Sequence, residues 1–177
     1  LEKFIPKEIR PKIITSYIGA NTPKILTKEE KISLKQKLGL NDKFIITIVG
    51  RIEEAKGQHI VLEAVESLRQ SGIRIKTLVV GGASSKEYFL DIKKMYKDAI
   101  FTDFVSNPTD FMQISDCVVL ATKKETFGLV LIEAMKCGVC VLGSNRGGPL
   151  EIIDDNETGL LFESMNIEDL YTKIKTF

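Results

Sequence analysis

The chain contains 177 residues, of which 44% are hydrophobic, so it can bury the core of one domain but is short for two. Its 25 Lys and Arg residues nearly balance 24 Asp and Glu residues, and the formal net charge of +1 gives no indication of a nucleic-acid partner or an anionic membrane surface. Apolar runs such as Phe44–Val49 fall far short of the roughly 20 residues that a membrane-spanning helix needs, so we expect no transmembrane segment.

The first residues are charged and contain two prolines, which is typical of a lead-in or an interdomain linker, and we assign residues 1–12 to it. The sequence starts at Leu1 without an initiator Met or a signal peptide, so we expect an excised domain or a processed form. Residues 13–177 are then predicted to form one domain. Its first two elements are predicted to be a short strand and a capped helix, over Ile13–Ile18 and Thr27–Leu38.

Phe44–Val49 is a continuous apolar run, typical of a strand that is buried on both faces of a parallel sheet. After it, helices and strands alternate to the end of the chain. Further strands are predicted over residues 75–80, 100–105, 117–121, 140–143 and 159–162. Helices are predicted over residues 57–70, 86–97, 108–115, 127–136, 149–153 and 167–177. This alternation indicates an α/β fold, a doubly wound parallel sheet with helices on both faces, in which ligands bind at the carboxyl ends of the strands.

The cysteines and the histidine give little support for a metal site. Cys117, Cys137 and Cys140 lie in apolar surroundings, and we expect buried thiols in a reducing compartment. The spacing of Cys137 and Cys140 also occurs in redox pairs, but the sequence has no second pair that could complete a zinc site. His59 is the only histidine, and we expect it on the surface or at a helix cap.

A loop with two cations follows the first buried strand. Gly50 ends the strand, and Arg51 and Lys56 flank the loop before the next helix. Arg51 offers a planar fork for phosphate oxygens and Lys56 offers a point charge, which together suit a diphosphate. A plainer alternative pairs both cations with Glu53 and Glu54 on a solvated loop, and the local sequence leaves both interpretations open.

A second loop follows the predicted strand over residues 75–80. It contains Gly81 and Gly82, which permit a close approach of the backbone. This signal is weak by itself, because many turns from a strand to a helix use glycine. We treat Gly50 and Gly81 as supporting residues of one ligand site, since both end strands at the predicted ligand-binding edge of the sheet.

The third stretch, ETFGLVLIE, places Glu125 and Glu133 eight residues apart at the start of a predicted helix. Gly128 leaves backbone N–H groups free at the helix start, and these donors form an anion site together with the helix dipole. Glu133 lies in an apolar run, where an unpaired carboxylate is costly, about 7 to 8 Å beyond the anion position. A ligand with a central diphosphate and a hydroxyl-rich ring at each end, such as a nucleotide sugar, would satisfy both carboxylates.

Each of these features also has an ordinary explanation. Glu133 can pair with Lys136 one turn later, and Glu125 can serve as a charge at the amino end of the helix. Gly147–Pro149 similarly form a turn before a helix start, with Glu151 in the first turn of that helix. Taken one at a time, the motifs leave the function open.

Most of the chain between Phe44 and Phe162 is covered by four segments, GRIEEAKG, VVGG, SDCVVLATKKETFGLVLIEAMKCGV and GGPLEIIDDNETGLLF. In their order and spacing they resemble the group 1 family of retaining glycosyltransferases, which have the GT-B architecture. In that family two Rossmann-like domains face each other, and the C-terminal domain holds the nucleoside-diphosphate sugar. The resemblance implies that this chain is the C-terminal half of the architecture. The acceptor, a glycan or a lipid-linked molecule, would bind through an N-terminal domain that is absent here.

The resemblance also implies a role for each candidate residue. The donor-binding residues would be Arg51, Lys56, Phe127, Gly128, Leu129 and Glu133. Among them, the two cations would neutralise the diphosphate together with the backbone amides of residues 127–129, and Glu133 would bind the ribose hydroxyls. Glu125 would approach the donor sugar as the catalytic residue. Because these groups would neutralise the leaving diphosphate, no metal or other cofactor is expected.

The resemblance implies a cytoplasmic protein of glycan biosynthesis, whose full-length form can lie at the inner face of a membrane. We expect the isolated domain to transfer no sugar, because half of the cleft is missing. Two alternatives stay open at this point: a sugar-nucleotide epimerase of the same architecture, and a non-catalytic Rossmann-like module that docks partners. Asp103 stands where the family usually has glycine, near the position at which the family holds the base.

Overall fold

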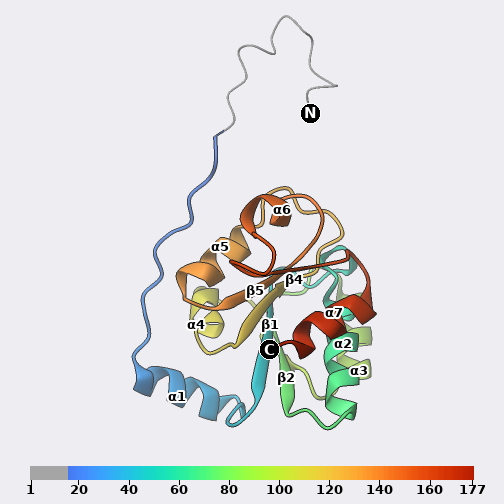
Figure 1. The fold of residues 1–177 in the computed structure, drawn as a ribbon. Coiled ribbons are helices and arrows are strands. Elements are labelled where there is room, and N and C mark those ends of the chain that lie inside the picture. Colours follow the sequence, from blue (N-terminus) through green and yellow to red (C-terminus); the bar gives the residue numbers. More distant parts are fainter. Residues whose placement is uncertain (1–15) are drawn as a thin grey trace, which may run out of the picture.

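The computed structural model describes residues 16–177 (Figure 1). The expected linker over residues 1–12 lies outside the described residues, and so does the first half of the expected strand Ile13–Ile18. The second half of that strand is wrong, because residues 16–18 belong to no strand. Residues of this stretch and just after it contact Phe127, Lys136 and Glu151, which lie in helices and a turn and not in a strand with which the stretch could pair.

The core of the domain is a six-stranded sheet in which all neighbouring strands are parallel. Its strands are β1 (Phe44–Val49), β2 (Ile75–Val80), β3 (Ile100–Phe101), β4 (Cys117–Leu120), β5 (Cys140–Ser144) and β6 (Leu160–Phe162). In the sheet they follow the order β3-β2-β1-β4-β5-β6. The chain therefore moves outward from β1 in one direction, returns, and continues outward from β4 in the other. The carboxyl ends of β1 and β4 flank the point at which the direction changes, where ligands bind in sheets of this kind.

Helices cover both faces of the sheet (Figure 1). They are α1 (Lys28–Lys37), α2 (Gln58–Gln70), α3 (Lys86–Met95), α4 (Pro108–Met112), α5 (Leu129–Lys136), α6 (Pro149–Ile152) and α7 (Ile167–Lys175), with a 3-10 helix over Glu54–Lys56. One apolar cluster joins β1 to α2 and α7 through residues such as Ile46, Leu68 and Leu170. A second cluster joins β4 and β5 to α5 through residues such as Val118 and Leu131. The predicted doubly wound α/β fold is therefore confirmed.

The buried strands begin and end close to their predicted positions, and β1 and β2 match them at both ends. Several other elements begin or end at different residues; α4, for example, ends at Met112 instead of residue 115. Two of the differences have a clear physical reason. β3 stops at Phe101 instead of residue 105, because it is an edge strand that pairs only with β2. α5 begins at Leu129 instead of Phe127, because Gly128 adopts the left-handed conformation at φ 97° and forms the N-cap.

The three cysteines do not share one environment. Cys117 is buried in β4, and Cys137 is half-buried at the end of α5. Cys140 is exposed, so the expectation that it is a buried core thiol is wrong. It is the first residue of β5, where the strand emerges at the amino edge of the sheet. In the part of the chain that the structure describes, no helix has both the length and the apolar composition needed to cross a membrane.

Candidate functional site

A pocket of about 390 Å³ lies at the switch point of the sheet, between the loop that follows β1 and the turn that precedes α5. It is lined by Ile18, Val49, Gly50, Arg51, Lys56, Leu120, Glu125, Thr126, Phe127, Gly128, Leu129 and Val130. The structure thus brings six of the seven predicted catalytic and donor-binding residues, together with the supporting Gly50, to one cavity. Glu133 and Gly81 do not line it.

The loop after β1 is fastened to the end of β4. Gly57 has φ 70°, and a Cβ atom there would lie 2.3 Å from the backbone oxygen of Ala121, so only glycine allows the two segments to pack this closely. The backbone oxygen of Ala55 accepts hydrogen bonds from the Thr122 hydroxyl at 3.0 Å and from the Lys123 N–H at 3.2 Å. These contacts fix the 3-10 turn that carries Lys56.

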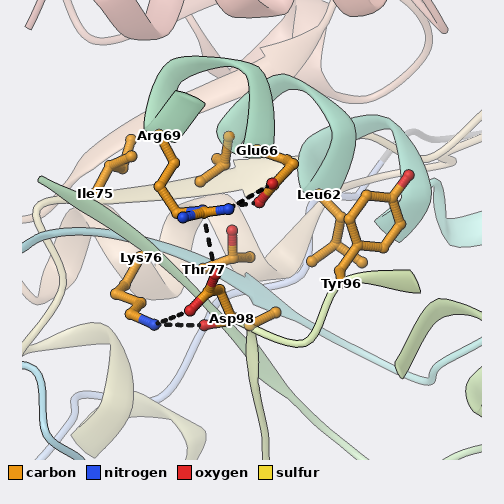
Figure 2. A pocket seen from close by; sticks show the side chains of 10 residues that line it. Leu62, Glu66, Arg69, Ile75, Lys76, Thr77, Tyr96 and Asp98 are labelled. Carbon is orange, nitrogen blue, oxygen red and sulfur yellow. Dashed lines mark hydrogen bonds and ion pairs between the residues drawn. The ribbon is translucent and has the colours of Figure 1, made fainter. Parts of the chain in front are cut away.

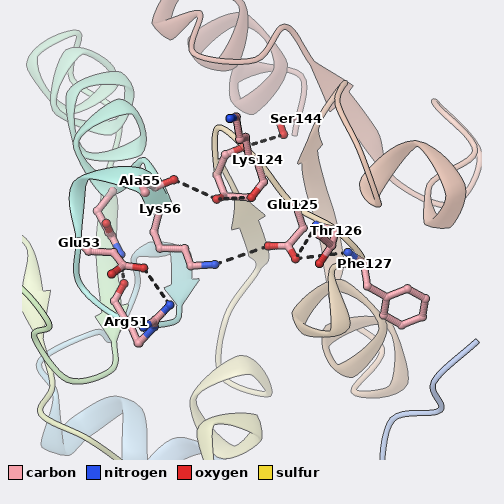
Figure 3. Close-up of polar contacts among 11 residues, drawn as sticks. Arg51, Glu53, Ala55, Lys56, Lys124, Glu125, Thr126, Phe127 and Ser144 are labelled. Atoms are coloured by element: carbon pink, nitrogen blue, oxygen red, sulfur yellow. Dashed lines mark hydrogen bonds and ion pairs between the residues drawn. The ribbon is translucent and has the colours of Figure 1, made fainter. Parts of the chain in front are cut away.

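Lys56 points across the pocket towards Glu125 (Figure 3). Its ammonium nitrogen lies 3.7 Å from Glu125 Oε2, and the two side chains are 29% and 16% exposed. The other carboxylate oxygen, Oε1, accepts the N–H groups of Thr126 at 3.2 Å and Phe127 at 3.4 Å. A half-buried cation and a well-anchored carboxylate therefore face each other where the predicted diphosphate and sugar would meet.

The contacts of Arg51 agree in part with the simpler interpretation, in which the cations of this loop pair with Glu53 and Glu54 in solvent. Its guanidinium pairs with Glu53 at 3.2 Å and is 71% exposed, although the residue also lines the pocket. Lys56 does not follow that alternative, since its carboxylate partner is Glu125 and neither Glu53 nor Glu54. Of the two cations, Lys56 is the one held inside the site.

The start of α5 supplies backbone donors to the same pocket. Gly128 forms its N-cap in a left-handed conformation, and no side chain of residues 16–177 caps this end of the helix. The first N–H groups of a helix have no partner within the helix, so those of Leu129 and Val130 are available to an acceptor in the pocket. Together with Lys56 they form a site that suits an anionic oxygen.

The turn that carries Glu125 is held by the Gly147–Gly148 pair, a role that the sequence analysis did not assign. A Cβ atom on Gly147 would lie 2.1 Å from the backbone oxygen of Glu125, and one on Gly148 would lie 2.0 Å from that of Phe127. The Gly148 N–H also donates to the Glu125 backbone oxygen at 3.1 Å. The glycine pair in the sequence was the only signal of this contact, and it did not reveal the partner.

Glu133 lies one turn further along α5, outside the lining of the pocket. Among residues 16–177 its carboxylate forms no hydrogen bond or ion pair, and partial burial raises the pKa of this group. The expected alternative, a pair with Lys136, is not formed, because the Lys136 ammonium donates to the backbone oxygen of Ala20. Within the described residues, a partly buried carboxylate without a side-chain partner therefore remains on the helix that begins at the pocket.

We expect the substitution Glu133→Gln to raise the melting temperature at pH 7. The raised pKa means that the folded chain holds this proton more tightly than the unfolded chain, so stability is lost as the pH rises through the folded-state pKa. A neutral amide avoids that loss. Thermal unfolding followed by circular dichroism should show a difference between variant and unchanged chain at pH 7 that closes towards about pH 4, below the ordinary value of 4.5. A gap of equal size at both pH values would contradict this origin.

A second pocket of about 190 Å³ adjoins the first and shares Val49, Gly50 and Arg51 with it. Its other walls come from the ends of β2 and β3, and include Gly81 and Phe104. Gly81 has φ 143°, and a Cβ atom there would lie 2.1 Å from the backbone oxygen of Gly50. The two supporting glycines thus bring the loops after β1 and β2 into contact beneath both pockets.

His59 and the ion pairs around Asp98 lie outside both pockets. His59 is half-buried, and its backbone N–H and ring Nδ1 contact the Tyr88 hydroxyl at 3.1 and 3.0 Å, while burial lowers the pKa of the ring. A cavity of only about 10 Å³ lies beside the amino end of β2. Asp98 bridges Arg69 and Lys76 there in an ion-pair network (Figure 2). Among the described residues, no three His, Cys, Asp or Glu side chains gather so that they could hold a metal ion.

Comparison with known proteins identifies the family that the sequence motifs resemble. Residues 30–177 match the family described as glycosyl transferases group 1. The chain is 26% identical over 190 residues to the capsular polysaccharide biosynthesis glycosyltransferase CapM of Staphylococcus aureus, covering 97% of this chain and 50% of CapM. It is 30% identical over 160 residues to the D-inositol 3-phosphate glycosyltransferase of Rhodococcus jostii, covering 83% of this chain and 35% of that protein.

Solved structures show the same relationship. Alr3699/HepE of Anabaena in complex with UDP and glucose matches with a TM-score of 0.79 at 26% identity, covering 85% of this chain and 43% of that one. The same protein in complex with UDP-glucose matches with a TM-score of 0.78 at 25% identity, again covering 85% and 43%. The chain spans half or less of the length of each of these relatives.

Proposed function

This chain belongs to the group 1 family of glycosyltransferases, and from that membership we propose that it is the domain that binds the sugar donor. The reaction would move a sugar from a nucleoside diphosphate to an acceptor with retention of configuration. The observation that carries the proposal is the pocket at the switch point, where Lys56, Glu125 and the uncapped start of α5 converge. A second, acceptor-binding domain would complete the cleft, and its acceptor would be a glycan or a lipid-linked molecule.

In this proposal the donor diphosphate lies between the loop after β1 and the start of α5. Lys56 and Arg51 contribute positive charge from one side, and the backbone amides around Gly128 contribute hydrogen-bond donors from the other. As the bond to the sugar breaks, negative charge grows on the leaving diphosphate, and these groups stabilise it. They would thereby supply the charge that a metal cofactor would otherwise provide.

The two glutamates take different ends of the donor. Glu125 lies in the pocket with one carboxylate oxygen near Lys56, so it would face the donor sugar and act as the catalytic residue. Glu133 follows the Gly128 N-cap by five residues, a rise of about 7 to 8 Å along α5. Its carboxylate, which has no partner among residues 16–177, would accept hydrogen bonds from the ribose hydroxyls, and these would offset the cost of the burial that raises its pKa.

A UDP-linked sugar is the donor that the comparisons favour, since UDP and UDP-glucose are bound by a similar protein of known structure. The adjoining pocket of about 190 Å³ would hold the base, because it continues the first pocket past Arg51. Asp103 and Phe104 lie in the loop beside it, and Asp103 replaces the glycine usual in the family. Because Asp103 lies beside the proposed base site, the choice of base is the part of donor specificity in which we expect this chain to differ most from its family.

A calorimetric titration of this chain with UDP-glucose, UDP-N-acetylglucosamine, GDP-mannose and the free nucleotides UDP and GDP tests the proposal. We expect at least one nucleotide sugar to bind with a micromolar dissociation constant and Glu133→Ala to weaken that binding about tenfold, through loss of charged hydrogen bonds. Lys37→Ala, which changes an exposed lysine on α1, serves as the control. If no compound binds, or if Glu133→Ala binds as the unchanged chain does, the assignment of this pocket fails.

The reaction itself is tested in a protein that includes the acceptor-binding domain. Nuclear magnetic resonance of the product should show the anomeric configuration of the donor preserved in the new glycosidic bond. An inverted product would contradict retention. Free isomerised sugar or nucleotide sugar, formed without any acceptor, would instead identify a sugar-nucleotide epimerase.

A further inference from the structure

The segment that precedes α1, residues 16–27, is fastened along one flank of the domain, and we call it the N-terminal strap. Figure 1 shows it as the blue trace that leads into α1. The side-chain amide of Gln113 forms two hydrogen bonds with the backbone of the strap. Its Oε1 accepts the Leu26 N–H at 2.9 Å, and its Nε2 donates to the Lys24 backbone oxygen at 2.8 Å. Further along, the Lys136 ammonium donates to the backbone oxygen of Ala20. The strap is thus bound to the ends of α4 and α5.

The far end of the strap reaches the candidate donor site. Ile18 lines the same pocket as Lys56 and Glu125. The ring of Tyr17 packs against the ring of Phe127, with a centroid distance of 6.2 Å and an interplanar angle of 34°. The Tyr17 hydroxyl donates a hydrogen bond of 3.3 Å to Glu151 Oε2 on α6.

These contacts connect the strap, the turn that contains Glu125, and α6 with one another. Phe127 is packed by Gly148 at its backbone oxygen and by Tyr17 at its ring. Gly148 and Glu151 belong to one short segment, because Gly148 is the N-cap of α6 and Glu151 lies in its first turn. Tyr17 therefore contacts both the turn and the segment against which the turn packs. Loss of its ring would free one side of Phe127, whose backbone belongs to the proposed diphosphate site.

We propose that the N-terminal strap is one wall of the donor pocket and that Tyr17 is a positioning residue for the Glu125–Gly128 turn. This inference rests on the proposed function. Tyr17 acts through Phe127, so donor affinity depends on a segment outside the sheet and its covering helices.

Calorimetric titration with UDP and GDP, used as probes for the diphosphate site, tests this role. We expect Tyr17→Ala to weaken binding of the nucleotide with the higher affinity by about fivefold, which is the size of effect that a packed aromatic pair provides. Tyr17→Phe keeps the ring and loses only the hydroxyl, so it should restore affinity to within about twofold of the unchanged chain. Ile25→Ala is the matched control, because Ile25 is 59% exposed and Tyr17 is 68% exposed, and Ile25 does not line the pocket; this variant should leave affinity unchanged.

A double variant separates positioning from a loss of folding. If Tyr17 acts through Phe127, the combined Tyr17→Ala and Phe127→Ala substitutions should weaken binding no further than Phe127→Ala alone. Melting temperatures of all variants identify any general unfolding, and Tyr17→Phe provides the second test should Tyr17→Ala fold poorly. Unchanged affinity in Tyr17→Ala, or fully additive losses in the double variant, would overturn the inference. If the unchanged chain binds neither UDP nor GDP, the proposed function itself fails, and the inference fails with it.

Discussion

Replacing Lys56 with alanine is expected to weaken the binding of UDP or of a UDP-linked sugar by about 50-fold, within the range for hydrogen bonds to charged groups. Lys56 is only 29% exposed and lies 3.7 Å from Glu125, so its loss removes a partly desolvated cation from the proposed diphosphate position. It also leaves the Glu125 carboxylate without its cation beside an anionic ligand. Repulsion between these two anions adds to the lost attraction. Calorimetric titration measures the change directly.

The matched control for this prediction is again Lys37→Ala, which removes the same charge from an exposed position in the last turn of α1. Because the net charge changes equally in both variants, any long-range effect of charge cancels in the comparison. Arg51→Ala should cause a smaller loss than Lys56→Ala, since Arg51 is 71% exposed and already paired with Glu53. A Lys56→Ala variant that binds within twofold of the control would contradict the assignment of Lys56.

Replacing Gly148 with alanine is expected to lower the free energy of unfolding by about 3 kcal/mol, the upper part of the range for overpacked sites. The backbone at Gly148 has φ −53° and ψ −39°, which alanine adopts without strain. The whole cost comes from contact, because the added methyl carbon would lie 2.0 Å from the Phe127 oxygen and 2.4 Å from its carbonyl carbon. Both are backbone atoms, so the turn must move as a unit. Urea denaturation measures the loss.

Gly19→Ala provides the control for this prediction, because no atom lies within 4 Å of the position that its Cβ would take. Its effect on the free energy of unfolding should be below about 0.5 kcal/mol, as for surface substitutions that disturb no contact. If Gly148→Ala folds, the displaced turn should also bind nucleotide more weakly. An unfolding free energy equal to that of the Gly19 variant would show that the turn and α6 are not packed as described.

The fold could be predicted from the sequence because its strongest signals are local. A continuous apolar run marks β1 and the shorter run Leu78–Val80 marks β2, and the ends of both strands agree with the prediction. Glycines mark the loops between strands and helices. The errors fall where local signals are weak. The edge position of β3 and the amino edge occupied by Cys140 depend on the strand order, which no single segment contains.

The site could be predicted only in part. The rule that ligands bind at strand ends identified the loop of Arg51 and Lys56 and the turn of Glu125, and the structure brings them to one pocket. The ion pair between Lys56 and Glu125 could not be predicted, because the loop and the turn meet only after β1 and β4 have paired. The packing of Tyr17 on Phe127 has the same cause, since residues far apart in sequence meet through the folded sheet.

The taper of the sheet bears on how the domain behaves in concentrated solution. The inner strands β1 and β2 have six residues each, whereas the edge strands β3 and β6 have two and three. An edge strand of this length exposes few unpaired backbone groups, and so offers little template for the edge-to-edge pairing that begins aggregation. The brevity of the outer strands therefore limits pairing between the sheets of separate molecules.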